Sequence, residues 1–192
     1  TNTEFYYNTY SAEHSLNIYR YNMQTNRSQQ ITYNPPMYKS GYLHWSPVHH
    51  LFVMCERNLN DKIINPQVYT MKADGKNKKK LITSGDIDYN PVWSPNGNYV
   101  AFIRQKNNAL SAIQETIVIE FYQGRSRRYN LSSTNKPIWI DSHSLLDLET
   151  EDGQTKLFVV PLDGIKKQFF PLDDDKGDLQ TLYKNPDLRR TH

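Results

Sequence analysis

The sequence is organised around a segment that recurs, imperfectly, at intervals of 46 to 48 residues. Trp45 begins a Trp-Ser-Pro triplet, Trp93 begins another 48 residues later, and Trp139 follows after a further 46 residues. These are the only three tryptophans of the 192-residue chain, so each one occupies the same slot of a repeat. A period of 40 to 50 residues is typical of folds that repeat one supersecondary unit.

Each repeat carries the patterns of several short strands. Two apolar runs follow each tryptophan, at 51–54 and 67–71, at 99–103 and 116–119, and at 145–148 and 157–160. A turn comes next, at Asn26, Gly75, Gly124 and Gly164, where Asn and Gly allow the positive φ of a tight hairpin. A last strand is expected at 29–32, 80–83 and 129–132. Four hairpin-linked strands per repeat predict an all-β fold, a β-propeller of four-stranded antiparallel blades.

Composition agrees with this architecture. Aromatic residues make up 12% of the chain, which suits half-buried pleated surfaces, and no long segment has an apolar stripe at helical spacing. No run of 18 apolar residues is present, so we expect no membrane span.

The segment from Val68 to Phe102 carries a more specific signal. It contains Met-Lys-Ala-Asp-Gly, then Leu-Ile-Thr, then Pro-Val-Trp-Ser-Pro-Asn-Gly and Val-Ala-Phe. In this it resembles the TolB-like propeller repeat, also called the WD40-like or PD40 repeat. Upstream, Val48-His49 replaces the usual Asp-Gly, and downstream the unit of Trp139 has lost Ser-Pro. The resemblance implies that Trp-Ser-Pro forms the innermost strand, that the loop before it reaches the channel entrance, and that the protein is bacterial and periplasmic or otherwise extracytoplasmic.

The repeat units divide the chain at about 1–32, 40–83, 89–132 and 136–172, followed by an acidic linker and tail at 173–192. This gives fifteen strands, one fewer than four complete blades. Residues 179–184 are the candidate closing strand of a four-bladed ring. The alternatives are an arc of a larger propeller and a unit that is completed by a second copy.

Binding residues are expected in the loops that precede the inner strands, because these loops converge around the channel mouth and display polar and aromatic side chains. The candidates are Tyr38, Lys39, Tyr42, His44, Asp86, Asp88, Tyr89, Asn90, Asn135 and Lys136. The competing interpretation is that Tyr89 and Asn90 only close the turn into Pro91.

No catalytic constellation is visible in the sequence. Gly-x-Ser-x-Gly, a Gly-rich phosphate loop and paired metal-ligand spacing are all absent, so no catalytic residue, cofactor or metal is expected. Cys55 is the single cysteine and is predicted to be a buried strand residue. We therefore expect a non-catalytic scaffold that binds a protein or peptide. The alternatives are the propeller of a metal-dependent polysaccharide lyase or the regulatory propeller of a prolyl-oligopeptidase-like peptidase.

Three further clusters receive a structural interpretation. His44, His49 and His50 surround a hairpin and are expected to be solvated turn residues, not zinc or manganese ligands. The acidic stretch 173–178 is expected to be a solvated linker, not a calcium loop. Basic runs at 76–80, 125–128 and 166–167 occupy equivalent hairpins, and we expect them to protect strand edges and to bind neither nucleic acid nor lipid.

Overall fold

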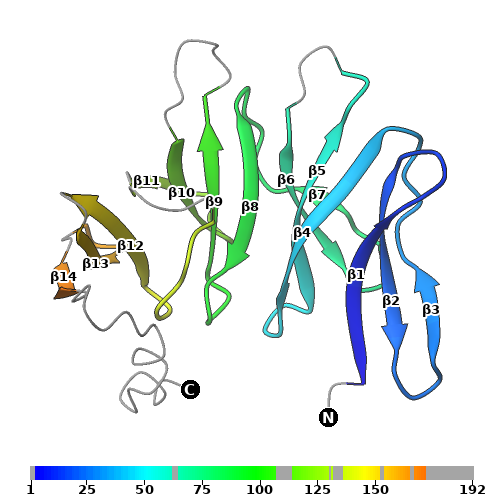
Figure 1. Cartoon of the computed structure of the whole chain (residues 1–192), viewed down its shortest axis with the longest axis horizontal. Coiled ribbons are helices and arrows are strands. Elements are labelled where there is room, and N and C mark those ends of the chain that lie inside the picture. The colour runs from blue at the N-terminus through cyan, green and yellow to red at the C-terminus, as the bar shows by residue number, and fades with distance from the viewer. Residues whose placement is uncertain are drawn as a thin grey trace. The chain divides into compact units, whose positions relative to one another are not determined.

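The computed structural model describes residues 3–61, 65–106, 114–129, 131, 136–151, 154–164 and 167–171. Strands are the only regular elements in these ranges, as the hydrophobic patterns predict (Figure 1). Within the same ranges, no helix is long and apolar enough to cross a membrane. The chain forms two compact units, the first from residues 1–130 and 135–137 and the second from 131–134 and 138–192.

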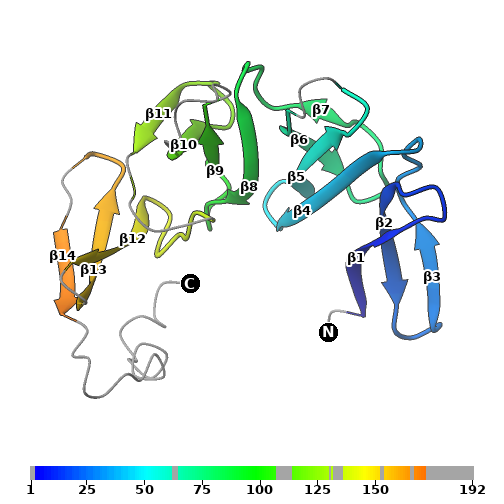
Figure 2. The same ribbon diagram turned by 45° about the horizontal axis from the view of Figure 1, so that its top comes forward.

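The first unit contains three groups of antiparallel strands, which follow one another in chain order in Figure 2. The first group is β1 (Glu4–Tyr10), β2 (Leu16–Asn22) and β3 (Arg27–Gln30). The second is β4 (Tyr38–Ser46), β5 (Leu51–Asn58), β6 (Gln67–Lys72) and β7 (Lys79–Lys80), and the third is β8 (Ile87–Trp93), β9 (Tyr99–Gln105), β10 (Gln114–Glu120) and β11 (Ser126–Tyr129). A parallel bridge between Leu16 and Lys39 joins the first group to the second.

Both Trp-Ser-Pro segments lie at the end of an inner strand. Trp45 pairs with Phe52, and Trp93 pairs with Val100, so the two tryptophans occupy equivalent positions in the ladder. The outer strands differ from the sequence-based expectation. The second group ends in the two-residue β7, which consists of two lysines and stops before the apolar residues of the expected strand 80–83. In the third group, β11 begins at Ser126 and not at 129, because Ser126 pairs with Ile119 directly after the Gly124 turn.

The second unit contains one antiparallel sheet, formed by β12 (Ser144–Glu151), β13 (Gln154–Pro161) and β14 (Lys167–Pro171). The inner strand predicted around Trp139 is reduced to an isolated bridge with Leu145. In place of Ser-Pro, a tight turn forms here, in which Asp141 accepts a hydrogen bond from the His143 amide at 2.7 Å. The described residues therefore contain fourteen strands, not fifteen. The acidic stretch 173–178 and the candidate closing strand 179–184 lie outside the described residues.

Apolar side chains from neighbouring groups form two cores in the first unit. The first joins β1–β3 to β4–β7 through Ile18, Ile31, Phe52, Met54 and Met71. The second joins β4–β7 to β8–β11 through Val53, Val68, Trp93, Val100, Phe102, Ile117 and Ile119. Full burial of a side chain such as Phe102 stabilises the fold by about 1.5–3 kcal/mol. The middle strands thus hold each group of strands against the next.

Glycine turns also contact the preceding group. Gly75 has a φ of +84°, and a Cβ added there would lie 2.5 Å from the carbonyl oxygen of Ile31. Gly124, in the equivalent hairpin of the next group, has a φ of +65°, but a Cβ there would meet no described atom within 4 Å. A substitution by a residue with a Cβ would strain the backbone at both glycines, because both have a positive φ. Only at Gly75 would the added Cβ also clash with the Ile31 carbonyl oxygen.

We therefore expect Gly75→Ala to cost more than Gly124→Ala. Both variants place alanine at positive φ, with a penalty of about 1–2 kcal/mol, and Gly75→Ala adds an overpacking cost of about 1–3 kcal/mol. Urea unfolding monitored by tryptophan fluorescence would measure the difference. Equal losses of stability in the two variants would contradict a packing role for the Gly75 turn.

Candidate functional site

The inner strands β4 and β8 share an irregularity that shapes the site. Trp45 pairs with Phe52, but Lys39 pairs with Arg57, so one extra residue has entered β4 between the two pairs. At this bulge Tyr42 has a φ of +56°, and Asn90 has a φ of +54° at the same place in β8. Asparagine tolerates this left-handed conformation, whereas a bulky residue adopts it rarely, and such residues are concentrated at functional sites. The bulge redirects the Tyr42 side chain.

A cavity of about 700 Å³ lies in the first unit next to this bulge. Its lining comes from β1, from Leu16 at the start of β2, from β4, β5 and β8, and from Pro66. The lining residues are Tyr6, Tyr7, Asn8, Tyr10, Leu16, Lys39, Gly41, Tyr42, Leu43, Cys55, Arg57, Pro66, Ile87 and Tyr89. The set combines five phenols with two cationic side chains, which is a composition suited to binding.

The tyrosines of this pocket differ in exposure. Tyr10 and Tyr42 are 59% and 63% exposed, while Tyr6 and Tyr89 are half-buried. Burial raises the pKa of Tyr6 and of Tyr89 above the ordinary value of 10.0. These two phenols therefore stay protonated at neutral pH and can donate hydrogen bonds to a ligand.

Three of the ten predicted binding residues line the pocket: Lys39, Tyr42 and Tyr89. Tyr38, His44 and Asn90 lie on the same inner strands but are not among the lining residues. Lys136 is exposed, and Asn135 lies outside the described residues. Asp86 and Asp88 belong to a separate network of ion pairs.

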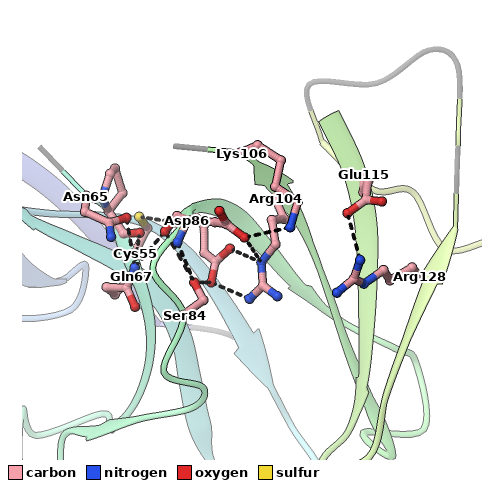
Figure 3. Close-up of polar contacts among 11 residues, drawn as sticks. Cys55, Asn65, Gln67, Ser84, Asp86, Arg104, Lys106, Glu115 and Arg128 are labelled. Atoms are coloured by element: carbon pink, nitrogen blue, oxygen red, sulfur yellow. Dashed lines mark hydrogen bonds and ion pairs between the residues drawn. The ribbon is translucent and has the colours of Figure 1, made fainter. Parts of the chain in front are cut away.

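Asp88 is completely buried and forms a two-point ion pair with Arg104 on the adjacent strand. Figure 3 shows Arg104 with its neighbours Ser84, Asp86 and Lys106. Arg104 donates from Nε to Oδ1 at 2.7 Å and from Nη2 to Oδ2 at 2.8 Å, and Ser84 donates to Oδ2 at 2.7 Å. The hydrogen bonds to Asp88 raise the pKa of Arg104. Asp86 lies closer to solvent, 3.1 Å from Lys106. Asp88 thus has a stabilising role between strands and is not open to a ligand.

Substitution of Asp88 by asparagine should destabilise the first unit strongly. The change removes the hydrogen-bonded counter-charge of the buried Arg104 guanidinium and leaves it only Asp86, whose Oδ2 lies 3.9 Å from Arg104 Nε, which costs about 3–5 kcal/mol. Asp86→Asn is the comparison variant, and the loss of its longer and more exposed ion pairs with Lys106 and Arg104 should cost at most about 1 kcal/mol. Chemical denaturation of the two variants provides the comparison. A loss at Asp88 no larger than that at Asp86 would show that the pair is not important for stability.

Two of the three histidines, His44 and His49, are not the solvated turn residues that were expected. The His49 ring packs against Trp93, Phe121 and Tyr122, with ring centroids 5.0 to 5.4 Å apart. Its Nε2 lies 2.8 Å from the Gly97 carbonyl oxygen, which can only accept a hydrogen bond, so Nε2 of His49 carries the hydrogen. The expectation failed because Val48-His49 replaces a small Asp-Gly turn with a ring that fills the gap beside the next group of strands. Of His44, His49 and His50, only His50 is exposed.

His44 links the two inner strands. Its Nδ1 accepts a hydrogen bond from the Trp93 amide at 3.1 Å, which requires an unprotonated nitrogen. Burial, and secondarily the positive charge of Lys136, lowers the pKa of His44 below the ordinary value of 6.5. Among the described residues, no group of three metal-ligating side chains lies close together.

Because the folded-state pKa of His44 is depressed, the unfolded chain binds more protons between that pKa and 6.5. Stability from this residue is therefore present above pH 6.5 and decreases as the pH falls below it. His44→Asn supplies a non-titrating acceptor and should show a smaller loss of unfolding free energy between pH 7.5 and 5.5. Denaturation curves at both pH values test this. If the unfolding free energy of the variant decreased with pH as it does in the unchanged protein, His44 would not be the source of the loss of stability.

Cys55 is 4% exposed, and its thiol donates to the Asp88 carbonyl oxygen at 3.3 Å. Burial raises the pKa of this thiol to about 12. It is therefore protonated at neutral pH and unsuited to act as a nucleophile, in agreement with the expectation of a buried strand residue.

Sequence reasoning missed the β1 side of the pocket and Arg57. The aromatic residues Tyr6, Tyr7 and Tyr10 indicate a strand, but not that its side chains line a pocket together with those of β4. Arg57 was missed because a regular hairpin around the turn at 47–50 would place Asn58 opposite Lys39, and only the bulge moves Arg57 there.

The basic runs form ion pairs that the sequence analysis did not predict. Lys78 lies 2.8 Å from both carboxylate oxygens of Glu56, whose side chain is 5% exposed. Arg128 lies 3.9 Å from Glu115. Some of these charges therefore neutralise carboxylates of the middle strands β5 and β10 in addition to covering an edge.

Comparison with known proteins identifies the fold. No family model matches the sequence, and no curated protein matches it. TolB from Acinetobacter baumannii is similar in structure, with a TM-score of 0.65 and 14% identity over 88% of this chain and 41% of TolB. A puromycin-hydrolysing peptidase of Mycobacterium tuberculosis is similar with a TM-score of 0.63 and 16% sequence identity, over 86% of this chain and 30% of the peptidase. An oligogalacturonate lyase in complex with manganese is similar with a TM-score of 0.61 and 14% sequence identity, over 82% of this chain and 43% of the lyase.

These similarities show that the chain has a β-propeller fold, as the repeat predicted. The chain spans less than half the length of each of these three proteins. At such low identity the comparison establishes the fold alone, and function must be argued from the residues of the site.

Proposed function

We propose that this chain is a non-catalytic, TolB-like β-propeller scaffold that binds a peptide or a segment of a protein in the pocket beside β1 and β4. The observation that carries the proposal is Tyr42, an exposed aromatic side chain held at positive φ at the pocket rim. A tyrosine provides a large contact area at low entropic cost, which favours it in protein interfaces.

The surrounding residues support binding more than chemistry. The titratable groups that could act as bases or nucleophiles near the pocket have structural partners: Asp88 binds Arg104, His44 binds the Trp93 amide, and the Cys55 thiol is protonated. The phenols and cations that line the pocket are recognition groups. By resemblance to TolB we also propose a periplasmic or otherwise extracytoplasmic location, which cell fractionation would test.

The test is selection of binding sequences from a phage-displayed random peptide library, followed by affinity measurement. We expect Tyr10→Ala/Tyr42→Ala to weaken the selected peptides about tenfold or more, because exposed aromatic anchors carry a large share of binding energy. Tyr33→Ala is the matched control, since Tyr33 is 79% exposed and does not line the pocket.

Peptides that bind the double variant as tightly as the unchanged protein would refute this pocket as the peptide site. Cleavage of an acidic oligosaccharide by the purified chain would instead favour the alternative of a lyase propeller.

A further inference from the structure

Two cationic side chains lie directly opposite each other at the pocket. Lys39 on β4 and Arg57 on β5 are register partners, and both line the cavity. Side chains in this relation have Cβ atoms about 4.5–5.5 Å apart, and like charges so placed are destabilising. A position of this kind is unfavourable for the empty protein and becomes favourable when an anion lies between the two charges.

The described residues do not supply that anion. The pocket lining contains no Asp or Glu, and within the described part of the chain no carboxylate lies within 4.0 Å of Lys39 or Arg57. The acids on neighbouring strands are already neutralised: Asp88 by Arg104, and Glu56 by Lys78. No carboxylate among the residues that the structure describes therefore compensates the positive charge of the pocket.

Aromatic groups border these charges. Lys39 Nζ lies 3.1 Å from the Tyr10 hydroxyl and 4.8 Å from the centre of its ring, which holds the ammonium at the rim next to an exposed aromatic face. Tyr6 and Tyr89 add protonated phenols to the lining. A carboxylate would meet two cations and hydroxyl donors here, while a neighbouring planar group could stack on Tyr10 or Tyr42.

We propose that this pocket recognises a short acidic peptide segment, with a side-chain carboxylate held between Lys39 and Arg57 and an adjacent aromatic residue on Tyr10 and Tyr42. This inference rests on the proposed function and specifies its ligand class. The cavity volume of about 700 Å³ falls in the range of small-ligand sites, so it accommodates a few residues and not a folded domain.

The experiment is isothermal titration calorimetry with two hexapeptides, acetylated and amidated at their ends. One alternates glutamate and tyrosine, and the other replaces each glutamate by glutamine. We expect the glutamate peptide to bind about tenfold more tightly or better, with an affinity that decreases as NaCl is raised. Lys39→Gln/Arg57→Gln should abolish the difference between the peptides.

Lys79→Gln/Arg27→Gln is the matched control, because both residues are exposed, lie on outer strands and do not line the pocket. It should bind both peptides like the unchanged protein. Melting temperatures of all proteins verify folding, and the pocket double variant should be no less stable than its control because it removes a like-charge pair.

Each other outcome has a definite meaning. Equal binding of the two peptides, lost on Tyr10→Ala/Tyr42→Ala, would overturn the acidic preference and leave peptide binding intact. Binding of a galacturonate tetramer but of neither peptide would overturn both proposals. Binding of the glutamate peptide that survives Lys39→Gln/Arg57→Gln would refute the assignment to this pocket.

Discussion

Face-to-face packing of neighbouring strand groups is the constraint on which the first unit depends. The middle strands β5 and β6 contribute apolar residues to both cores, whereas β9 and β10 contribute to the second core, so none of the three groups buries its apolar surface alone. Val53 and Met54 show this clearly, since adjacent residues of β5 belong to different cores. Loss of either contact exposes a whole sheet face. The hydrogen bond from the Trp93 amide to His44 links the second group to the third at their inner strands, and the Asp88–Arg104 ion pair stabilises β8 against β9 within the third group.

The two equivalent tryptophans show how far the repeats have diverged. Trp93 is 3% exposed and lies beneath Phe121, with ring centroids 4.7 Å apart, and His49 packs on it from the preceding group. Trp45 is 37% exposed, because Ala73 stands where the third group has Phe121. The ladder position is therefore set by the backbone repeat, whereas burial depends on residues about 28 positions further along the chain.

The repeat pattern of the sequence predicted the all-β class and the propeller fold, because hydrophobic alternation and turn residues are local signals. The inner position of Trp45 and Trp93 was implied by the resemblance to the TolB-like repeat. The sequence did not predict the weak inner pairing at Trp139, which is an isolated bridge with Leu145. Of the pocket, it indicated Lys39, Tyr42 and Tyr89 but not Arg57, because a one-residue bulge alters which side chains meet. Asp86 and Asp88 were predicted to be binding residues at the channel mouth, and only the fold reveals their ion pairs with Arg104 and Lys106.

The bulge occurs twice, at Tyr42 and at Asn90, in inner strands of otherwise matching register. The backbone accepts a small amide at one copy and a large phenol at the other while the flanking pairs stay the same. Such a scaffold separates the property of holding its shape from the property of choosing a ligand. New specificities can then arise one blade at a time, through single codons, without redesign of the sheets that support them.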